Sequence, residues 1–252
     1  MNTLIVANWK MHPQGLSGAK ALVAATKKAA IAAKTVTVVI APPAVFLRDV
    51  AKGAKNPRIS FAAQNAHYDK EGAHTGEVSM AEVKDAGASY VIIGHAERRA
   101  LGESNDDTRK KVAAAIATGL KPILCVGEKA RDEEGDYLQG FSDQVLIGLA
   151  DVPKNKLKMV TIAYEPVWAI GGKEAMSPNA MHEMSLYIHK LLIEPFGKAA
   201  LSIPVLYGGS IDEGNARVML AEGEVQGLLV GRVSAEADRF AALLKIVGAA
   251  KA

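Results

Sequence analysis

Three residues of the types that move protons or stabilise negative charge each follow a different apolar run of the sequence. Lys10 follows T-L-I-V-A-N-W, His95 follows S-Y-V-I-I-G, and Glu165 follows M-V-T-I-A-Y. Carboxylates and imidazoles are common general acids and bases, and an ammonium group stabilises a developing oxyanion. If the three runs end at one place, these side chains form a set that can transfer protons. Asn8 shares the side of its strand with Lys10 and is expected to join them.

Two glycine-bearing turns follow two further apolar runs. Gly208-Gly209-Ser210 comes after P-V-L-Y, and Gly231-Arg232 comes after G-L-L-V. Each turn leads into a segment with a helical pattern. The free N–H groups and the dipole at a helix N-terminus favour an anion such as a phosphate. The sequence therefore predicts a phosphate site next to the ionisable residues.

Each residue also has an ordinary interpretation when taken alone. A lysine at a strand end is commonly a solvated charge, and a single histidine is commonly a hydrogen-bonded structural one. A carboxylate can belong to a structural ion pair, and glycines can simply form turns. A functional site is favoured only because each of these residues follows a predicted strand. Whether the residues meet depends on the fold.

Other reactive residues do not form a recognisable site in the sequence. His182 and Glu183 lack the second histidine of a zinc-protease helix, and Ser210 lies outside a G-x-S-x-G turn. His182 and His189 are expected on a helix surface, and Cys125 in the core of a strand. No cluster of metal ligands is visible, so we expect neither a metal nor an organic cofactor.

Eight short apolar runs span the chain and are separated by amphipathic segments. They are residues 3–9, 36–41, 59–64, 89–94, 122–127, 159–164, 204–209 and 227–231. Continuous rather than alternating apolar runs indicate strands buried on both faces, hence a parallel sheet. Helix starts are expected at Ser79, Ser104, Ser177-Pro178 and Asp212.

This order of elements predicts an α/β fold, a single (β/α)8 barrel domain over residues 1–252. The alternative is an open doubly wound sheet, but the first strand ends in N-W-K rather than in a glycine-rich phosphate loop. In a (β/α)8 barrel, the loops after the strands converge on one face. The fold would therefore bring Lys10, His95 and Glu165 to one mouth.

Composition excludes several classes of partner. The chain has 252 residues, 49% of them hydrophobic, and a formal net charge of +3 with both signs interspersed. We therefore expect no nucleic-acid partner and no membrane span. The single cysteine, Cys125, fits a reducing compartment, and the chain begins with a strand pattern rather than a leader pattern. A cytoplasmic location is expected.

Motifs across nearly the whole chain resemble the triosephosphate isomerase family. They are N-W-K-M (8–11), A-A-Q-N (62–65), T-G-E-V-S (75–79), I-I-G-H-A-E-R-R (92–99), I-L-C-V-G-E (123–128), A-Y-E-P-V-W-A-I-G (163–171), L-Y-G-G-S (206–210) and L-L-V-G (228–231). The resemblance implies a TIM barrel enzyme of glycolysis and gluconeogenesis. It would interconvert dihydroxyacetone phosphate and glyceraldehyde 3-phosphate by proton transfer through an enediolate, without a cofactor.

The resemblance also implies roles for single residues. Glu165 would be the base, and His95 the neutral electrophile that polarises the carbonyl, as in this family. Lys10 would stabilise the enediolate and Asn8 would orient the substrate oxygen. Glu97, which enters the helix after His95, is expected to support the site.

The family resemblance implies a phosphate site and a closing flap. The backbone N–H groups of Gly171, Ser210, Gly231 and Arg232 would hold the phosphate. The flap would be residues 166–175, latched by Tyr207 and Ser210 when closed. It would exclude water from the intermediate.

Three positions depart from the family pattern. The flap has Gly171-Gly172-Lys173 where the family has one more residue, Ala96 replaces a serine, and Arg232 replaces the second glycine of its turn. The shortened flap and the missing second glycine leave room for an isomerase or epimerase of another sugar phosphate. A non-catalytic relative that only binds a phosphorylated metabolite is the other alternative, and the presence of all three ionisable residues argues against it.

The segment Gly72–Ser79 resembles the loop that family members insert into a second subunit. Thr75 would then approach the mouth of the partner's barrel. The resemblance therefore implies a homodimer formed through this loop.

Overall fold

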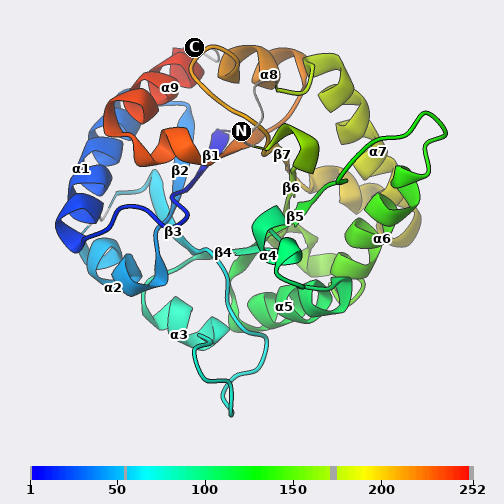
Figure 1. Cartoon of the computed structure of the whole chain (residues 1–252), viewed down its shortest axis with the longest axis horizontal. Coiled ribbons are helices and arrows are strands. Elements are labelled where there is room, and N and C mark those ends of the chain that lie inside the picture. The colour runs from blue at the N-terminus through cyan, green and yellow to red at the C-terminus, as the bar shows by residue number, and fades with distance from the viewer. Residues whose placement is uncertain (1, 54–55, 171–174, 250–252) are drawn as a thin grey trace.

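The structure is a computed structural model that describes residues 2–53, 56–170 and 175–249. Its strands are β1 Thr3–Asn8, β2 Val36–Ala41, β3 Ile59–Ala63, β4 Tyr90–Ile93, β5 Lys121–Val126, β6 Thr161–Tyr164, β7 Val205–Tyr207 and β8 Gly227–Val230. Each strand pairs in parallel with the next, and β8 pairs with β1, so the sheet closes into a barrel (Figure 1). The predicted (β/α)8 barrel is confirmed, and the open-sheet alternative is wrong.

Helices form a ring around the outside of the barrel, and the short α4 lies inside this ring near β4 and β5 (Figure 1). They are α1 Leu16–Ala32, α2 Ala44–Gly53, α3 Met80–Asp85, α4 Ala96–Ala100, α5 Asn105–Thr118, α6 Tyr137–Leu149, α7 Pro178–Phe196, α8 Ala216–Glu222 and α9 Ala237–Ala249. Short 3-10 helices lie at η1 Lys154–Met159, η2 Val167–Ala169, η3 Gly197–Ser202 and η4 Arg232–Ala235. Among the described residues, no helix combines the length and the apolar character that a membrane span requires.

The continuous apolar runs are explained by two buried faces. Along β1, Val6 belongs to a cluster that fills the barrel, whereas Ile5 and Ala7 belong to a larger cluster beneath the helices. Successive side chains of a strand point to opposite faces, so both sets are buried. Cys125 lies in the inner cluster, as predicted, and burial raises the pKa of its thiol well above the ordinary value.

Helix starts follow the capping residues at three of the four predicted places. Ser79 and Ser104 form complete capping boxes, and Ser177 caps α7, with Pro178 at the first helical position. The fourth prediction is wrong by a few residues. Asp212 accepts the N–H groups of Gly214 and Asn215 in a turn, so α8 begins only at Ala216.

Candidate active site

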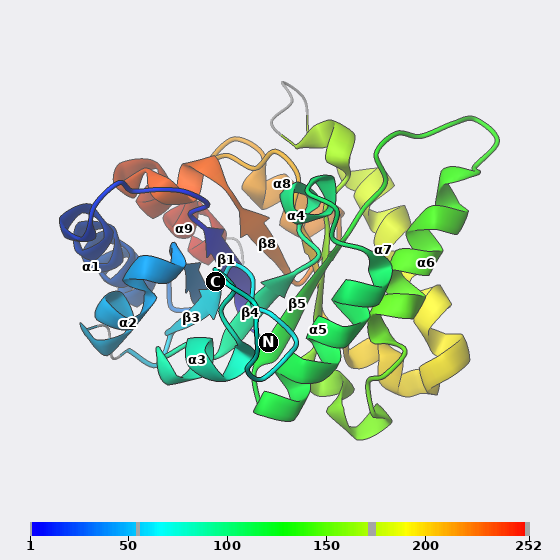
Figure 2. The same cartoon turned by 60° about the horizontal axis from the view of Figure 1, so that its bottom comes forward.

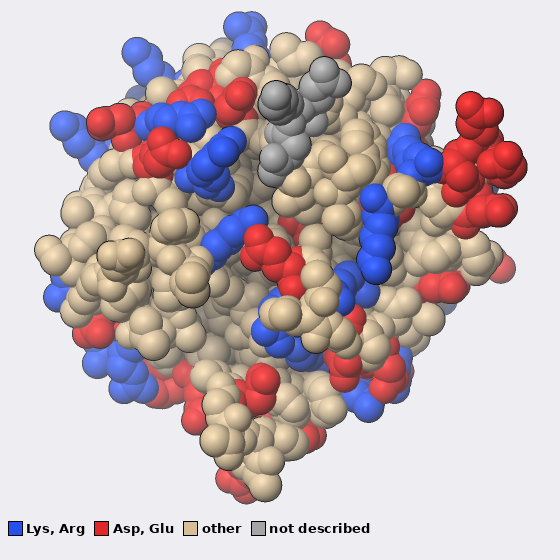
Figure 3. Space-filling view, in the orientation of Figure 1, with Lys and Arg blue, Asp and Glu red and all other residues tan. Residues whose placement is uncertain are grey.

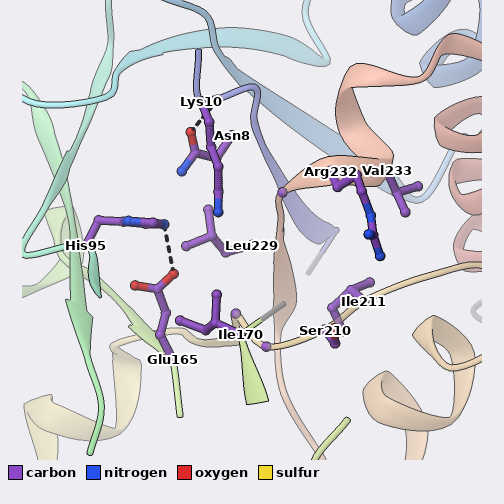
Figure 4. Close-up of a pocket in the computed structure, with 13 residues that line it drawn as sticks. Asn8, Lys10, His95, Glu165, Ile170, Ser210, Ile211, Leu229, Arg232 and Val233 are labelled. Atoms are coloured by element: carbon purple, nitrogen blue, oxygen red, sulfur yellow. Dashed lines mark hydrogen bonds and ion pairs between the residues drawn. The ribbon is translucent and has the colours of Figure 1, made fainter. Parts of the chain in front are cut away.

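One pocket lies at the carboxyl end of the strands, in the middle of the face shown in Figure 3. Its described lining residues are Asn8, Lys10, His95, Glu165, Ile170, Gly208, Gly209, Ser210, Ile211, Leu229, Gly231, Arg232 and Val233. These residues lie in or directly after the carboxyl-terminal parts of β1, β4, β6, β7 and β8 (Figure 4). The fold therefore brings the predicted ionisable residues and both glycine-bearing turns to one cavity.

His95 and Glu165 face each other inside this pocket. The Nε2 atom of His95 lies 3.2 Å from Oε1 of Glu165, and both side chains are more than nine-tenths buried (Figure 4). The backbone N–H of Glu97 donates to Nδ1 of His95 at 3.2 Å. Because that nitrogen accepts a hydrogen bond, the neutral ring carries its proton on Nε2, which points into the pocket. His95 thus presents a hydrogen-bond donor to the pocket.

The carboxylate of Glu165 is positioned by backbone on two sides. Its Oε2 atom accepts the N–H of Ala96 at 3.3 Å. A Cβ atom on Gly208 would lie 2.7 Å from Cγ of Glu165, so the glycine provides room for the side chain. At position 96, where the family serine hydroxyl is missing, the backbone N–H still holds the carboxylate.

Lys10 has a backbone conformation that is rare outside glycine. Its φ of +52° costs on the order of 1–3 kcal/mol unless neighbouring groups fix it. Two contacts do so: its N–H donates to Oδ1 of Asn8 at 3.1 Å, and its carbonyl accepts Nε2 of Gln64 at 2.8 Å. Its ammonium donates to Glu97 at 2.5 Å across the pocket rim. The charge of Lys10 is therefore held beside His95 and Glu165.

The proposed phosphate end lies across the pocket from His95. Asn215 donates to the carbonyl of Ser210 at 2.8 Å and holds that turn, while Ser234 donates to the carbonyl of Gly231 at 2.7 Å. Arg232 begins η4 and is not among the described residues with positive φ. The arginine therefore occupies the second glycine's place without backbone strain, and its side chain extends toward the Ser210 turn (Figure 4).

Both described ends of the flap are anchored to the barrel. At the first end, the indole N–H of Trp168 donates to Oε1 of the buried Glu128 at 3.0 Å. At the second end, the N–H of Met176 donates to the hydroxyl of Tyr207 at 3.0 Å. Burial raises the pKa of Tyr207, so this hydroxyl stays neutral. The predicted phosphate ligand Gly171 and its neighbour Gly172 lie outside the described residues.

Sequence reasoning missed the supporting roles of Gln64 and Glu128. Glu128 also accepts the hydroxyl of Tyr164 and pairs with Arg131 at 2.8 Å. The only signal for both residues was their place at strand ends, in A-A-Q-N and C-V-G-E. The sequence around Gln64 and Glu128 does not indicate which groups their side chains hydrogen-bond.

Two findings concern predicted or newly seen groups that lie outside the pocket, in the loop before α3. Thr75 is exposed in a loop that projects away from its own barrel, so it does not line this pocket (Figures 1 and 2). The same loop brings His67, Asp69 and His74 together, a group of metal-ligating side chains that the sequence did not reveal.

Comparison with known proteins identifies the family of the chain. A profile of the family described as triosephosphate isomerase matches residues 3–247. Curated relatives named triosephosphate isomerase include one from Trichlorobacter lovleyi, 39% identical over 97% of this chain and 98% of the relative. Others come from Carboxydothermus hydrogenoformans, 38% identical over 96% and 97%, and Endomicrobium trichonymphae, 37% identical over 96% and 97%. Since the match covers both chains almost completely, this chain belongs to the triosephosphate isomerase family.

Proposed function

We propose that this chain interconverts dihydroxyacetone phosphate and glyceraldehyde 3-phosphate with Glu165 as base, His95 as electrophile and Lys10 as electrostatic stabiliser. The observation that carries the proposal is that these three side chains line one pocket, with Nε2 of His95 at 3.2 Å from Glu165. Family membership makes the protein an enzyme of this reaction, which serves glycolysis and gluconeogenesis. We propose that residues 1–252 act as one catalytic domain.

The proton transfer follows from the geometry of the two facing side chains. Glu165 removes a proton from the hydroxyl-bearing carbon next to the substrate carbonyl and returns it to the former carbonyl carbon. Between these two steps the hydroxyl proton passes to the former carbonyl oxygen by way of the His95 imidazole, so the hydroxyl and carbonyl groups exchange places. The Nε2–H group of His95 donates to the carbonyl oxygen, where negative charge develops, and it has the correct tautomer for this. A positioned base contributes ~10²–10⁴ in rate and an aimed donor ~10²–10³. No step requires a group that the chain's own residues lack.

The remaining pocket residues orient the substrate. Lys10 stabilises the enediolate, and Asn8, whose Oδ1 accepts the N–H of Lys10, offers its amide N–H₂ to a substrate oxygen. Backbone N–H groups of Ser210, Gly231 and Arg232, together with Gly171, bind the phosphate. Binding energy from this remote phosphate is then used for orientation at the reacting carbons.

We further propose that two copies of the chain assemble through the loop Gly72–Ser79. Exposed apolar side chains also follow the neighbouring strands β1 and β2: Met11 is 88% and Val45 78% exposed. A second copy would cover them, and Thr75 would reach the partner's pocket. Sedimentation that gives a monomer at micromolar concentration would contradict this assembly. A cytoplasmic location stays a prediction.

A coupled assay with glyceraldehyde 3-phosphate tests the function. The wild type should turn over, and Glu165→Gln should lose at least about 10³-fold in kcat because its amide cannot accept the proton. Glu183→Gln, in an exposed carboxylate on α7, is the matched control and should turn over normally. Equal turnover of Glu165→Gln and wild type would contradict the assignment of Glu165 as the base of an isomerase.

Further assays of the same wild-type protein distinguish the two alternative functions. An isomerase or epimerase of another sugar phosphate would be inactive with the triose but active with a longer phosphorylated sugar. A binding-only relative would bind the triose phosphate in calorimetry and turn over none of these compounds.

A further inference from the structure

The projecting loop between β3 and α3 carries a second group of reactive side chains, separate from the pocket at the barrel mouth. Nε2 of His74 lies 2.8 Å from Oδ2 of Asp69, and Nδ1 of His67 lies 3.9 Å from the same oxygen. One ligand atom from each of the three residues falls within 4.8 Å of the others. The loop lies at the outer edge of the molecule, away from the barrel axis (Figure 1).

We propose that His67, Asp69 and His74 bind a divalent transition-metal ion of the zinc class. Bonds of about 2.0–2.1 Å in a tetrahedral zinc site place neighbouring ligand atoms about 3.3 Å apart. The observed separations of 2.8 and 3.9 Å lie on either side of this value. Two imidazoles and one carboxylate suit zinc, nickel or cobalt rather than magnesium or calcium, which prefer oxygen ligands.

An ion would replace existing hydrogen bonds of the two imidazoles. The backbone N–H of Asp69 donates to Nδ1 of His67 at 3.0 Å, so the lone pair of this nitrogen is engaged and must be released before it can bind a metal. A proton between His74 and Asp69 holds them together at 2.8 Å, and a metal would replace it. The rings of His67 and His74 stack with centroids 4.2 Å apart. Ion binding therefore requires one of these two rings to turn, so that both lone pairs point at the ion.

The surroundings of the three ligands favour a cation. They face a hollow whose wall also includes the carboxylates of Glu71, Glu77 and Glu82, and a single lysine, Lys70. With neutral imidazoles, this wall carries an excess of negative charge. Carboxylates or water molecules in the hollow could complete the coordination of an ion bound to two histidines and one aspartate.

The ligands connect the base of the loop to its tip. His67 is fixed at the base, since its N–H donates to the carbonyl of Val78 at 2.8 Å. His74 lies near the tip and approaches Gly72 so closely that a Cβ atom there would be 3.2 Å from its Nε2. A bound ion would therefore clamp the tip onto the base. Its effect on assembly rests on the proposed function, because the clamped segment is the one proposed to reach a second copy.

Metal titration of the full chain tests the site. Chelator-treated wild type is titrated with Zn²⁺ by calorimetry and with Co²⁺ by visible absorption, which reports nitrogen coordination. One ion per chain is expected, with no response to Mg²⁺. His67→Asn and His74→Asn should each weaken Zn²⁺ binding by about tenfold or more. His182→Asn is the matched control, since Nδ1 of His182 lies 3.5 Å from Glu224 without a second imidazole.

Three results would overturn the site: no Zn²⁺ binding by wild type at millimolar concentration, equal binding by wild type and both loop variants, or equal loss in His182→Asn. The chelator-treated wild type is also assayed for isomerisation. Full turnover without Zn²⁺ binding overturns the metal site alone. Zn²⁺ binding without turnover overturns the proposed function alone.

Discussion

The side-chain amide of Gln64 donates to the carbonyl of Lys10 at 2.8 Å, and the same nitrogen donates to the carbonyl of Ala41 at 2.8 Å. Gln64 thus ties Lys10, in the turn after β1, to the end of β2. The tie acts on a residue whose φ of +52° is unfavourable on its own. The position of the Lys10 charge in the pocket therefore depends on a residue that contacts no substrate in the proposed mechanism.

Gln64→Ala should lower both stability and activity. The substitution leaves the Lys10 carbonyl without its side-chain donor, which costs about 1–3 kcal/mol of unfolding free energy. Displacement of Lys10 should lower kcat by roughly tenfold or more. Urea unfolding and steady-state kinetics measure the two effects. Gln139→Ala, which removes an exposed amide bonded to Asp143, is the control and should change neither.

The Lys10–Glu97 pair predicts a pH dependence of stability. Partial burial raises the pKa of Glu97, but the hydrogen bond and charge of Lys10 outweigh it, so the pKa lies below the ordinary value of 4.5. A lowered folded-state pKa gives stability that is present above 4.5 and is lost as the pH falls through the folded pKa. Because Glu97 is half-exposed, the contribution should be about 0.2–1 kcal/mol.

The measurement is the unfolding free energy of wild type minus that of Glu97→Gln, at fixed protein concentration from neutral pH downward. This difference should shrink below pH 4.5. Lys10→Met removes the same ion pair and should therefore lose the same pH-dependent contribution to the unfolding free energy. A difference that grows on acidification would contradict the assigned direction.

Gly209→Ala should damage the flap anchor. A Cβ atom at this position would lie 2.1 Å from the hydroxyl oxygen of Tyr207, which accepts the N–H of Met176. Since Tyr207 is fully buried, its ring cannot move without loss of packing. We expect a loss of about 1–3 kcal/mol in unfolding free energy and a lower kcat. Gly140→Ala, in α6 with nothing within 4 Å of the added Cβ, should instead be neutral or stabilising. Equal effects of the two substitutions would rule out the steric explanation.

The sequence predicted the barrel and the pocket because both depend on where residues fall along strands. Lys10, His95 and Glu165 follow β1, β4 and β6, and closure of a parallel barrel is sufficient to bring such positions together. The start of α8 was misplaced because Asp212 can cap a turn as well as a helix.

Other features depend on side-chain contacts between distant segments, and the sequence contains no pattern for them. Gln64 reaches the carbonyl of a residue that is 54 positions away. His67, Asp69 and His74 meet only because the loop folds back on itself, with Gly72 leaving room for the imidazole. Residue types and spacing do not specify such a fold-back.

Arg232→Gly should change substrate binding more than chemistry. The position does not need positive φ, so glycine offers the same backbone N–H to the phosphate, and kcat should stay within about tenfold of wild type. The guanidinium extends along the pocket toward Ser210, and no ion pair of Arg232 is found among the described residues (Figure 4). Its loss should raise KM by up to about tenfold, and less at high salt, because an exposed charge is screened. Steady-state kinetics at two salt concentrations measure this, and Arg232→Lys, which keeps the charge, should restore most of the affinity. A collapse of kcat in Arg232→Gly with unchanged KM would instead place the arginine in the chemical step.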